Sequence, residues 1–185
     1  MTQAFLTVQE IKDYPLPVKS DQWAKATDAQ ILTVIEYASE HIEDYLDRKV
    51  ASAYYLERIP GGNSNSLILS QYPIISLFDV TSTDYIESAT IYDLSYFLIH
   101  REAGILEWVD KSRYYFYKSM NYTVDYQAGY ETIPGPIKHA TALQTVQMLQ
   151  PIFRGSTNFA PAELIEGMND TIVDLLEKYK RKRIG

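Results

Sequence analysis

Residues 27–48 read TDAQILTVIEYASEHIEDYLDR, and this stretch decides the fold of the chain. Thr27 and Gln30 fit the pattern of a helix-capping box, and neither Gly nor Pro interrupts the run. At about 1.5 Å per residue, the predicted helix is roughly 30 Å long, so its apolar face needs other elements to cover it. That face consists of residues at helical spacing: Ile31, Val34, Ile35, Ala38, Ile42, Tyr45 and Leu46.

Further helices are predicted over residues 7–14, 137–153 and Asn169–Lys182. A capping box opens the first of them, and Pro151 is expected to kink or end the second. Residues 18–26 are polar and predict an irregular connection. We expect helices 27–48 and 137–153 to pack through Ile35, Ala38, Ile42, Leu143 and Leu149.

Between these helices, residues 53–127 change to a β pattern of alternating, β-branched and aromatic residues separated by turn signals. A hairpin turn is expected near Gly104. The order of helices, strands and helices predicts an α+β fold, in which helices from both ends of the chain form a small bundle and an antiparallel β region is inserted. We expect residues 1–168 to form one domain, and residues 169–185 to form a C-terminal helix and basic tail.

Composition excludes several classes of protein. The chain has 185 residues, a formal net charge of -7 and no Cys, so disulfides and thiolate metal sites are excluded. No apolar run approaches the length of a membrane span. The negative charge disfavours general attraction to nucleic acid. The charge is uneven, because residues 178–183 are strongly basic.

No catalytic constellation is present in the sequence. The three histidines, His41, His100 and His139, lie in no metal-binding motif, and no Gly-x-Ser-x-Gly elbow occurs. We therefore expect neither catalysis nor a metal or cofactor. One alternative stays open, a carbohydrate-binding or carbohydrate-active domain that uses tyrosines, acids and Trp108.

Five segments in order carry a resemblance to a family. Residues 38–48 read ASEHIEDYLDR and resemble the pattern AS-x-x-IE-x-Y-x-x-R, and residues 67–76, LILSQYPIIS, resemble LLL-x-x-x-PI-x-S. Residues 124–140, VDYQAGYETIPGPIKHA, resemble V-x-Y-x-AGY-x-x-x-P-x-x-(I/L)-K-x-A. With residues 6–14 and 104–106, these segments resemble the head–tail connector proteins of tailed bacteriophages, also called adaptor or head-completion proteins.

The resemblance implies a non-enzymatic virion protein at the head–tail interface, made in the host cytoplasm. Its copies would form a ring, by resemblance a dodecamer, between the portal protein and a tail or neck protein below. DNA would pass through the ring without specific binding. Another phage neck or tail-completion protein is a further alternative.

Three groups of residues are candidates for these roles. Acidic residues of the long helix would line the channel: Glu36, Glu40, Glu43, Asp44 and Asp47. Nine of the 16 tyrosines lie between Tyr85 and Tyr130, and some would contact a neighbouring subunit: Tyr92, Tyr96, Tyr114, Tyr115 and Tyr117. The C-terminal segment would dock on the portal through Leu175, Leu176, Tyr179, Arg181, Arg183 and Ile184, although a frayed, solubilising tail is the alternative.

Overall fold

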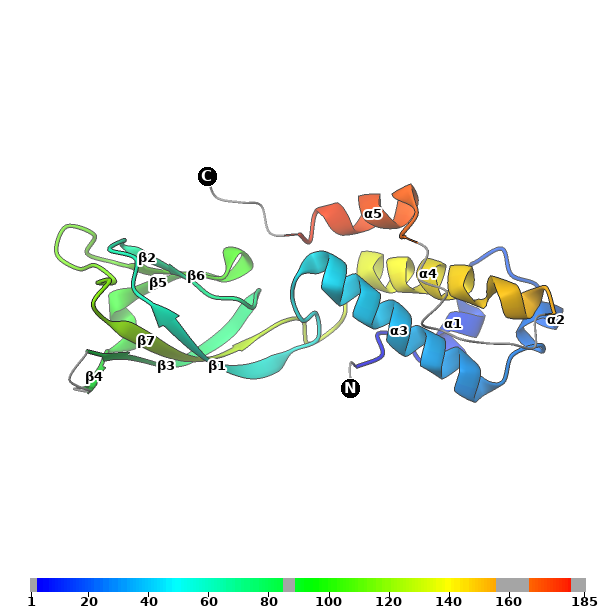
Figure 1. The fold of residues 1–185 in the computed structure, drawn as a ribbon, viewed down its shortest axis with the longest axis horizontal. Coiled ribbons are helices and arrows are strands. Elements are labelled where there is room, and N and C mark those ends of the chain that lie inside the picture. Colours follow the sequence, from blue (N-terminus) through cyan, green and yellow to red (C-terminus); the bar gives the residue numbers. More distant parts are fainter. Residues whose placement is uncertain (1–2, 85–88, 156–166, 181–185) are drawn as a thin grey trace. The chain divides into compact units, whose positions relative to one another are not determined.

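The computed structural model describes residues 3–84, 89–155 and 167–180. The chain divides into two compact units (Figure 1). The helical unit consists of the described residues of Met1–Asp47 and Thr132–Gly185, and the β unit consists of those of Arg48–Glu131. The predicted α+β fold, with an antiparallel β region inserted between helices, is confirmed.

The helical unit contains α1 (Val8–Asp13), α2 (Ser20–Trp23), α3 (Asp28–Leu46), α4 (Gly135–Phe153) and α5 (Asp170–Glu177). The predicted helices 7–14, 27–48 and 137–153 are confirmed to within two residues at each end, and α4 ends two residues after Pro151. Two predictions were wrong. The polar connection 18–26 contains α2, and α5 stops at Glu177, with residues 178–180 outside the helix and the remaining predicted positions outside the described residues.

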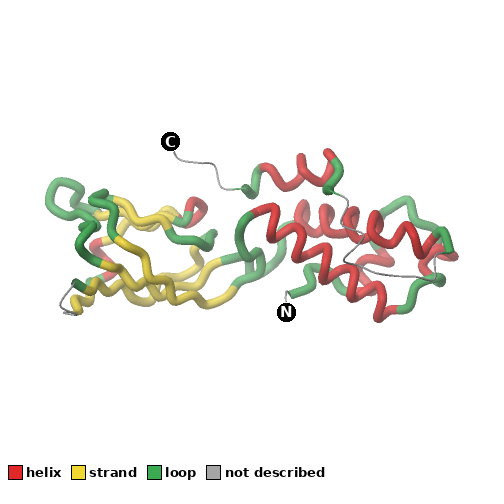
Figure 2. Tube along the Cα trace, in the orientation of Figure 1, coloured by secondary structure: helices red, strands yellow, loops and turns green. Residues whose placement is uncertain are grey.

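The core of the helical unit lies between α3 and α4, which Figure 2 shows side by side. Ile35, Ala38, Ile42 and Leu149 are fully buried, as predicted. Leu143, however, is only half-buried. The buried face of α4 instead includes polar residues: Thr141, Gln144 and Thr145. Both threonine hydroxyls donate to the carbonyl oxygen four residues earlier, at 2.8 Å, which makes their burial tolerable.

The β unit consists of two antiparallel sheets, with β1 (Ala53–Pro60), β2 (Ser66–Ile68), β3 (Ile74–Thr83), β4 (Ala89–Ile91), β5 (Phe97–His100), β6 (Ile105–Trp108) and β7 (Asn121–Ala128). The strand order is β1-β7-β3-β4 in the four-stranded sheet and β2-β6-β5 in the three-stranded sheet. Gly104, with a φ of 65°, lies in the turn between β5 and β6 as predicted.

An aromatic cluster fills the core that both sheets share. The Trp108 ring centroid lies 4.5 Å from that of Phe97 and 5.3 Å from that of Phe116, and Phe116 meets Tyr122 edge-on at 4.9 Å. Trp108 is only 2% exposed. Much of the aromatic content of this region therefore forms the core, and Trp108 is not part of any sugar-binding surface.

The two ends of the β unit are joined to each other. Ala51 and Tyr130 form a parallel bridge, in which the Tyr130 amide donates to the Val50 carbonyl at 2.8 Å. Gly129 lies beside this bridge with a φ of 104°, and a Cβ there would lie 2.6 Å from the Ala51 carbonyl oxygen. The Arg48 guanidinium lies over the rings of Tyr72 and Tyr130, 4.1 and 5.4 Å from their centroids. Apart from Val50 and Ala51, the residues that hold the two ends together lie in three of the segments that resemble the connector family: 38–48, 67–76 and 124–140.

Candidate assembly surfaces

The acidic candidates on α3 form one exposed stripe, with one exception. Glu36, Glu40 and Asp44 recur every four residues, so they share a face of the helix, and Asp47 follows at its C-terminal cap; all four are exposed. Glu43 is different, because it is only 5% exposed. Its assignment to an open channel wall was therefore wrong. The stripe of four carboxylates is a continuous negative surface.

The candidate portal-binding residues near the C-terminus differ in how deeply they are buried. Leu176 is fully buried in the helical unit, so its assignment as a free anchor was wrong, whereas Leu175 and Tyr179 are half-buried. Arg181, Arg183 and Ile184 lie outside the described residues. The helix α5 packs on α4, and Tyr45 of α3 adds a hydrogen bond to it. The Tyr45 hydroxyl donates to Glu177 Oε1 at 2.5 Å, and this hydrogen bond to a carboxylate raises the pKa of Tyr45 to about 12.

The five tyrosine candidates also divide into two kinds. Tyr92 and Tyr114 are half-buried and pack on Trp108, with ring centroids 5.3 and 5.1 Å from it. The Tyr92 hydroxyl also lies 2.9 Å from Ser82 Oγ. These two tyrosines therefore serve the core of the β unit. The other three expose between 39% and 49% of their surface: Tyr96, Tyr115 and Tyr117.

Residues 109–120 form a loop, here called the tip, that the rest of the β unit holds firmly. The Asn63 amide donates to the Phe116 carbonyl at 2.8 Å, and the Phe116 side chain is fully buried. The Gly61 amide donates to the Met120 carbonyl at 2.9 Å, and the Tyr117 amide donates to the buried Tyr122 hydroxyl at 3.0 Å. The exposed cations of the tip are Lys111, Arg113 and Lys118.

A second exposed surface, which sequence reasoning missed, lies on the four-stranded sheet. It is here called the outer face and consists of Tyr54, Leu56, Phe78, Asp79, Ile91 and Asp125. Tyr54 and Leu56 are 73% and 75% exposed on β1, and the Tyr54 ring stacks on Phe78 with centroids 5.7 Å apart. The available signal was the alternation along β1, which puts these two residues out of phase with the inward-facing Tyr55 and Ile59.

The described histidines and acids are not grouped as metal ligands would be. Within residues 3–84, 89–155 and 167–180, no three His, Asp or Glu side chains are grouped so that they could hold a metal ion. His100 lies 3.0 Å from Glu107, whose pKa is lowered chiefly by a hydrogen bond from Lys111. His139 stacks on Tyr14, and His41 lies 3.4 Å from the Gln144 amide nitrogen. Among the described helices, none is long and apolar enough to cross a membrane.

The fold defines a class of protein in which a helical unit, made from both ends of the chain, carries an inserted antiparallel β unit. The chain belongs to the head completion protein family, whose sequence profile matches residues 4–148. No curated protein matches the chain.

Proteins in solved structures of gene transfer agent (GTA) particles share this fold. A protein in the virion of the native GTA particle is 16% identical, with a TM-score of 0.66 over 100% of this chain and 94% of that chain. A protein in the neck of the native GTA particle, computed with C12 symmetry, is 14% identical, with a TM-score of 0.64 over 100% and 95% of the two chains. A protein in the neck of the empty particle, computed with C6 symmetry, is 15% identical, with a TM-score of 0.63 and the same coverage.

Proposed function

We propose that the chain is a structural virion protein that forms a head–tail connector ring. The ring would join the portal protein to a tail or neck protein below it. The observation that carries this proposal is the family match over residues 4–148, most of the helical unit and all of the β unit. The likeness to proteins of a particle neck, which extends over this whole chain, supports the same role.

The ring would contain twelve copies at the head–tail junction of the virion. A similar protein occurs in a particle neck computed with C12 symmetry, which supports this number. Head-to-tail contacts between identical subunits close into a ring when the rotation per subunit allows it. Repeated weak contacts with a multimeric portal would then add up to stable attachment, even where the single subunit binds weakly. This role is structural, not catalytic.

The exposed stripe of α3 would face the DNA channel. Glu36, Glu40 and Asp44 present three carboxylates on one face of the helix, and Asp47 adds an exposed fourth at its C-terminal cap. A wall of this kind repels phosphates, so DNA would slide through without being held. Twelve copies of the stripe would multiply the effect. Tight binding of DNA by the assembled ring at physiological salt would contradict this assignment.

The C-terminal segment would dock on the portal. Leu175 on α5 and Tyr179 just after it are half-buried, and the basic residues that follow would pair with portal carboxylates. Arg181, Arg183 and Ile184 complete this segment. Removing residues 181–185 leaves every described contact of α5 in place, including the Lys180 ammonium 4.2 Å from the Tyr45 ring centroid. The truncated chain should therefore stay folded while losing portal binding, and that binding should weaken with salt in the full chain.

The experiment that tests the proposal combines the purified chain with the portal protein of its own particle. Native mass measurement and negative-stain images should show twelve copies added to each portal as a ring. The truncated chain, with an unchanged melting temperature, should not add. Attachment of single copies, or no attachment by the full chain, would overturn the proposal. The carbohydrate alternative has lost its main support, because Trp108 is buried.

A further inference from the structure

We propose that the tip of one copy binds the outer face of the four-stranded sheet of the next copy. This inference rests on the proposed ring and names the two surfaces that would join its subunits. It is carried by an apolar, doubly acidic surface and a basic, aromatic loop on the same β unit. The two surfaces are complementary in charge, and both carry exposed aromatic rings.

The outer face is more apolar than an ordinary sheet surface in water. The stacked rings of Tyr54 and Phe78 come from strands on either side of β7. Leu56, 75% exposed, lies beside them on β1. Ile91, also 75% exposed, lies at the other edge of the sheet in register with Thr81. Exposed apolar side chains that cluster, as Tyr54, Leu56 and Phe78 do, are typical of protein contact sites.

Two carboxylates lie directly opposite each other within this apolar surface. Asp125 on β7 is in register with Leu56 on one side and with Asp79 on the other. Asp79 accepts a hydrogen bond from the Thr81 hydroxyl at 2.9 Å. Arg58 lies on the neighbouring row of the same face, yet no cation within the described part of the chain forms an ion pair with either carboxylate. Cations from another molecule would neutralise the pair.

The tip offers cations and aromatic rings in a fixed arrangement. Lys111 is already paired with Glu107 at 2.7 Å. Arg113 and Lys118 are exposed and form no ion pair among the described residues. The Lys118 amide is fixed by Asn63 Oδ1 at 2.8 Å. Arg113 also lies over the Tyr114 ring of its own tip, 5.5 Å from the centroid. The tip therefore presents two exposed cations without an ion pair among the described residues, and their number equals that of the two carboxylates of the outer face.

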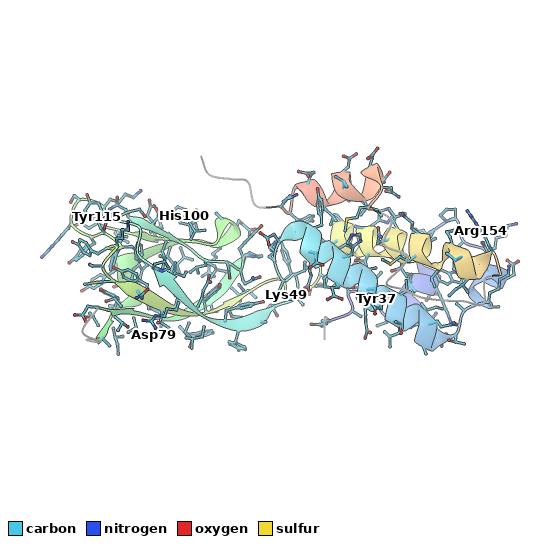
Figure 3. The ribbon with its side chains drawn as sticks, in the orientation of Figure 1. Tyr37, Lys49, Asp79, His100, Tyr115 and Arg154 are labelled. Carbon is cyan, nitrogen blue, oxygen red and sulfur yellow. The ribbon has the colours of Figure 1, made fainter. Side chains whose placement is uncertain are left out.

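A single copy cannot bring its own tip to its own outer face. Tyr115 of the tip and Asp79 of the outer face lie on opposite sides of the β unit (Figure 3). The contact must therefore join different copies. Because the two surfaces differ, the contact is head-to-tail, the type that generates a ring when it closes. The tip rings of Tyr115 and Tyr117 would lie on Tyr54 and Phe78.

The natural absence of Cys permits a direct test by disulfide trapping. Chains carrying both Leu56→Cys and Tyr115→Cys, assembled on portals and then oxidised, should give a ladder of covalent oligomers. Each single-cysteine variant should stay monomeric. A matched control pairs Tyr115→Cys with Leu98→Cys, which is 49% exposed on the three-stranded sheet, and should give no ladder. A ladder from the control alone, or from neither double variant, would overturn the proposal.

Charge reversal provides the second test. Arg113→Glu with Lys118→Glu, or Asp79→Lys with Asp125→Lys, should each weaken ring closure at least tenfold, and all four changes together should restore it. Lys19→Glu and Glu102→Lys change exposed charges elsewhere and should have no effect. Rings that form equally well in every variant would contradict this inference but leave the proposed function intact. Failure of the wild-type chain to assemble on the portal would instead count against the proposed function.

Discussion

Asp79 of β3 and Asp125 of β7 occupy directly opposed positions of the four-stranded sheet, with no cation paired to either within the described chain. A β-bulge creates this pairing. The register shifts between Leu77 and Asp79, so Phe78 becomes the extra residue and Asp79 takes the place opposite Asp125. Like charges in that relationship destabilise a sheet. The isolated chain thus keeps an unfavourable contact on an exposed face.

Asp125→Asn should stabilise the isolated chain, because it removes the like-charge contact while keeping the shape of the side chain. We expect the free energy of unfolding to rise by about 0.2–1 kcal/mol, measured by urea denaturation. Ring assembly on portals should weaken in the same variant. A control, Glu131→Gln, removes an exposed carboxylate outside both surfaces and should change neither quantity. Lower stability of Asp125→Asn would show that the opposed carboxylates do not repel.

Ile42→Asp should destabilise the helical unit, because Ile42 is fully buried in α3. The lost apolar contacts and the buried carboxyl together should cost at least about 3 kcal/mol, seen as a lower melting temperature and reduced soluble yield. Leu32→Asp makes the same change at a site on α3 that is 41% exposed and should have a much smaller effect. Equal melting temperatures for wild type and Ile42→Asp would contradict the observed packing.

Glu10 should make stability depend on pH. The Lys138 ammonium, 2.7 Å away, and the Thr7 amide lower the pKa of Glu10 to about 2. Because the folded-state pKa lies below the ordinary value near 4.5, the stabilisation is complete above about pH 4.5 and is lost as the pH falls toward 2.

Glu10→Gln isolates this charge, since Gln also completes a capping box. The variant should be less stable than wild type by about 0.2–1 kcal/mol at pH 7, the range of exposed ion pairs. The difference should vanish near pH 2. In a Lys138→Met background it should shrink at every pH, and a difference that stays constant with pH would exclude the ion pair as its cause.

Gly61→Ala should displace the tip. A Cβ at Gly61 would overlap the backbone carbonyl of Tyr117. Because the clashing atoms belong to the backbone, a side-chain rotation cannot relieve the overlap. We expect loss of the hydrogen bonds that fix the tip, read out as faster amide exchange at Asn63 and Phe116, and weaker ring assembly. Gly62→Ala is the control, because its Cβ meets nothing within 4 Å. Unchanged exchange in Gly61→Ala would show that the tip tolerates the shift.

The sequence predicts the parts of the fold that follow from a regular period. The apolar stripe of α3 identifies both the helix and its buried face, and the turn at Gly104 follows from its position between two strands. The buried face of α4 was partly wrong at Leu143, because Thr141 and Thr145 satisfy their hydroxyls within the helix and so can be buried. A hydrophobic pattern cannot predict this burial, because it does not register hydrogen bonds between a side chain and its own helix.

The assembly surfaces were less predictable. Leu176 and Glu43 carry the residue types expected of an anchor and a channel wall, but tertiary packing buries both. Tyr92 and Tyr115 are chemically identical, yet one packs on Trp108 and the other is exposed. The bulge at Phe78 sets which side chains share the outer face, and it depends on pairing with a strand more than 40 residues away.

The bridge between Ala51 and Tyr130 makes the β unit a self-contained insert. Val50 and Ser52, near its start, are hydrogen-bonded to Tyr130, near its end, so the chain enters and leaves the unit at neighbouring positions. Such an insert is exchangeable: it can be shortened, replaced or grafted onto a related helical unit without rerouting the chain. We therefore expect the contacts proposed for the tip and the outer face to diversify between relatives while the helical unit stays the same.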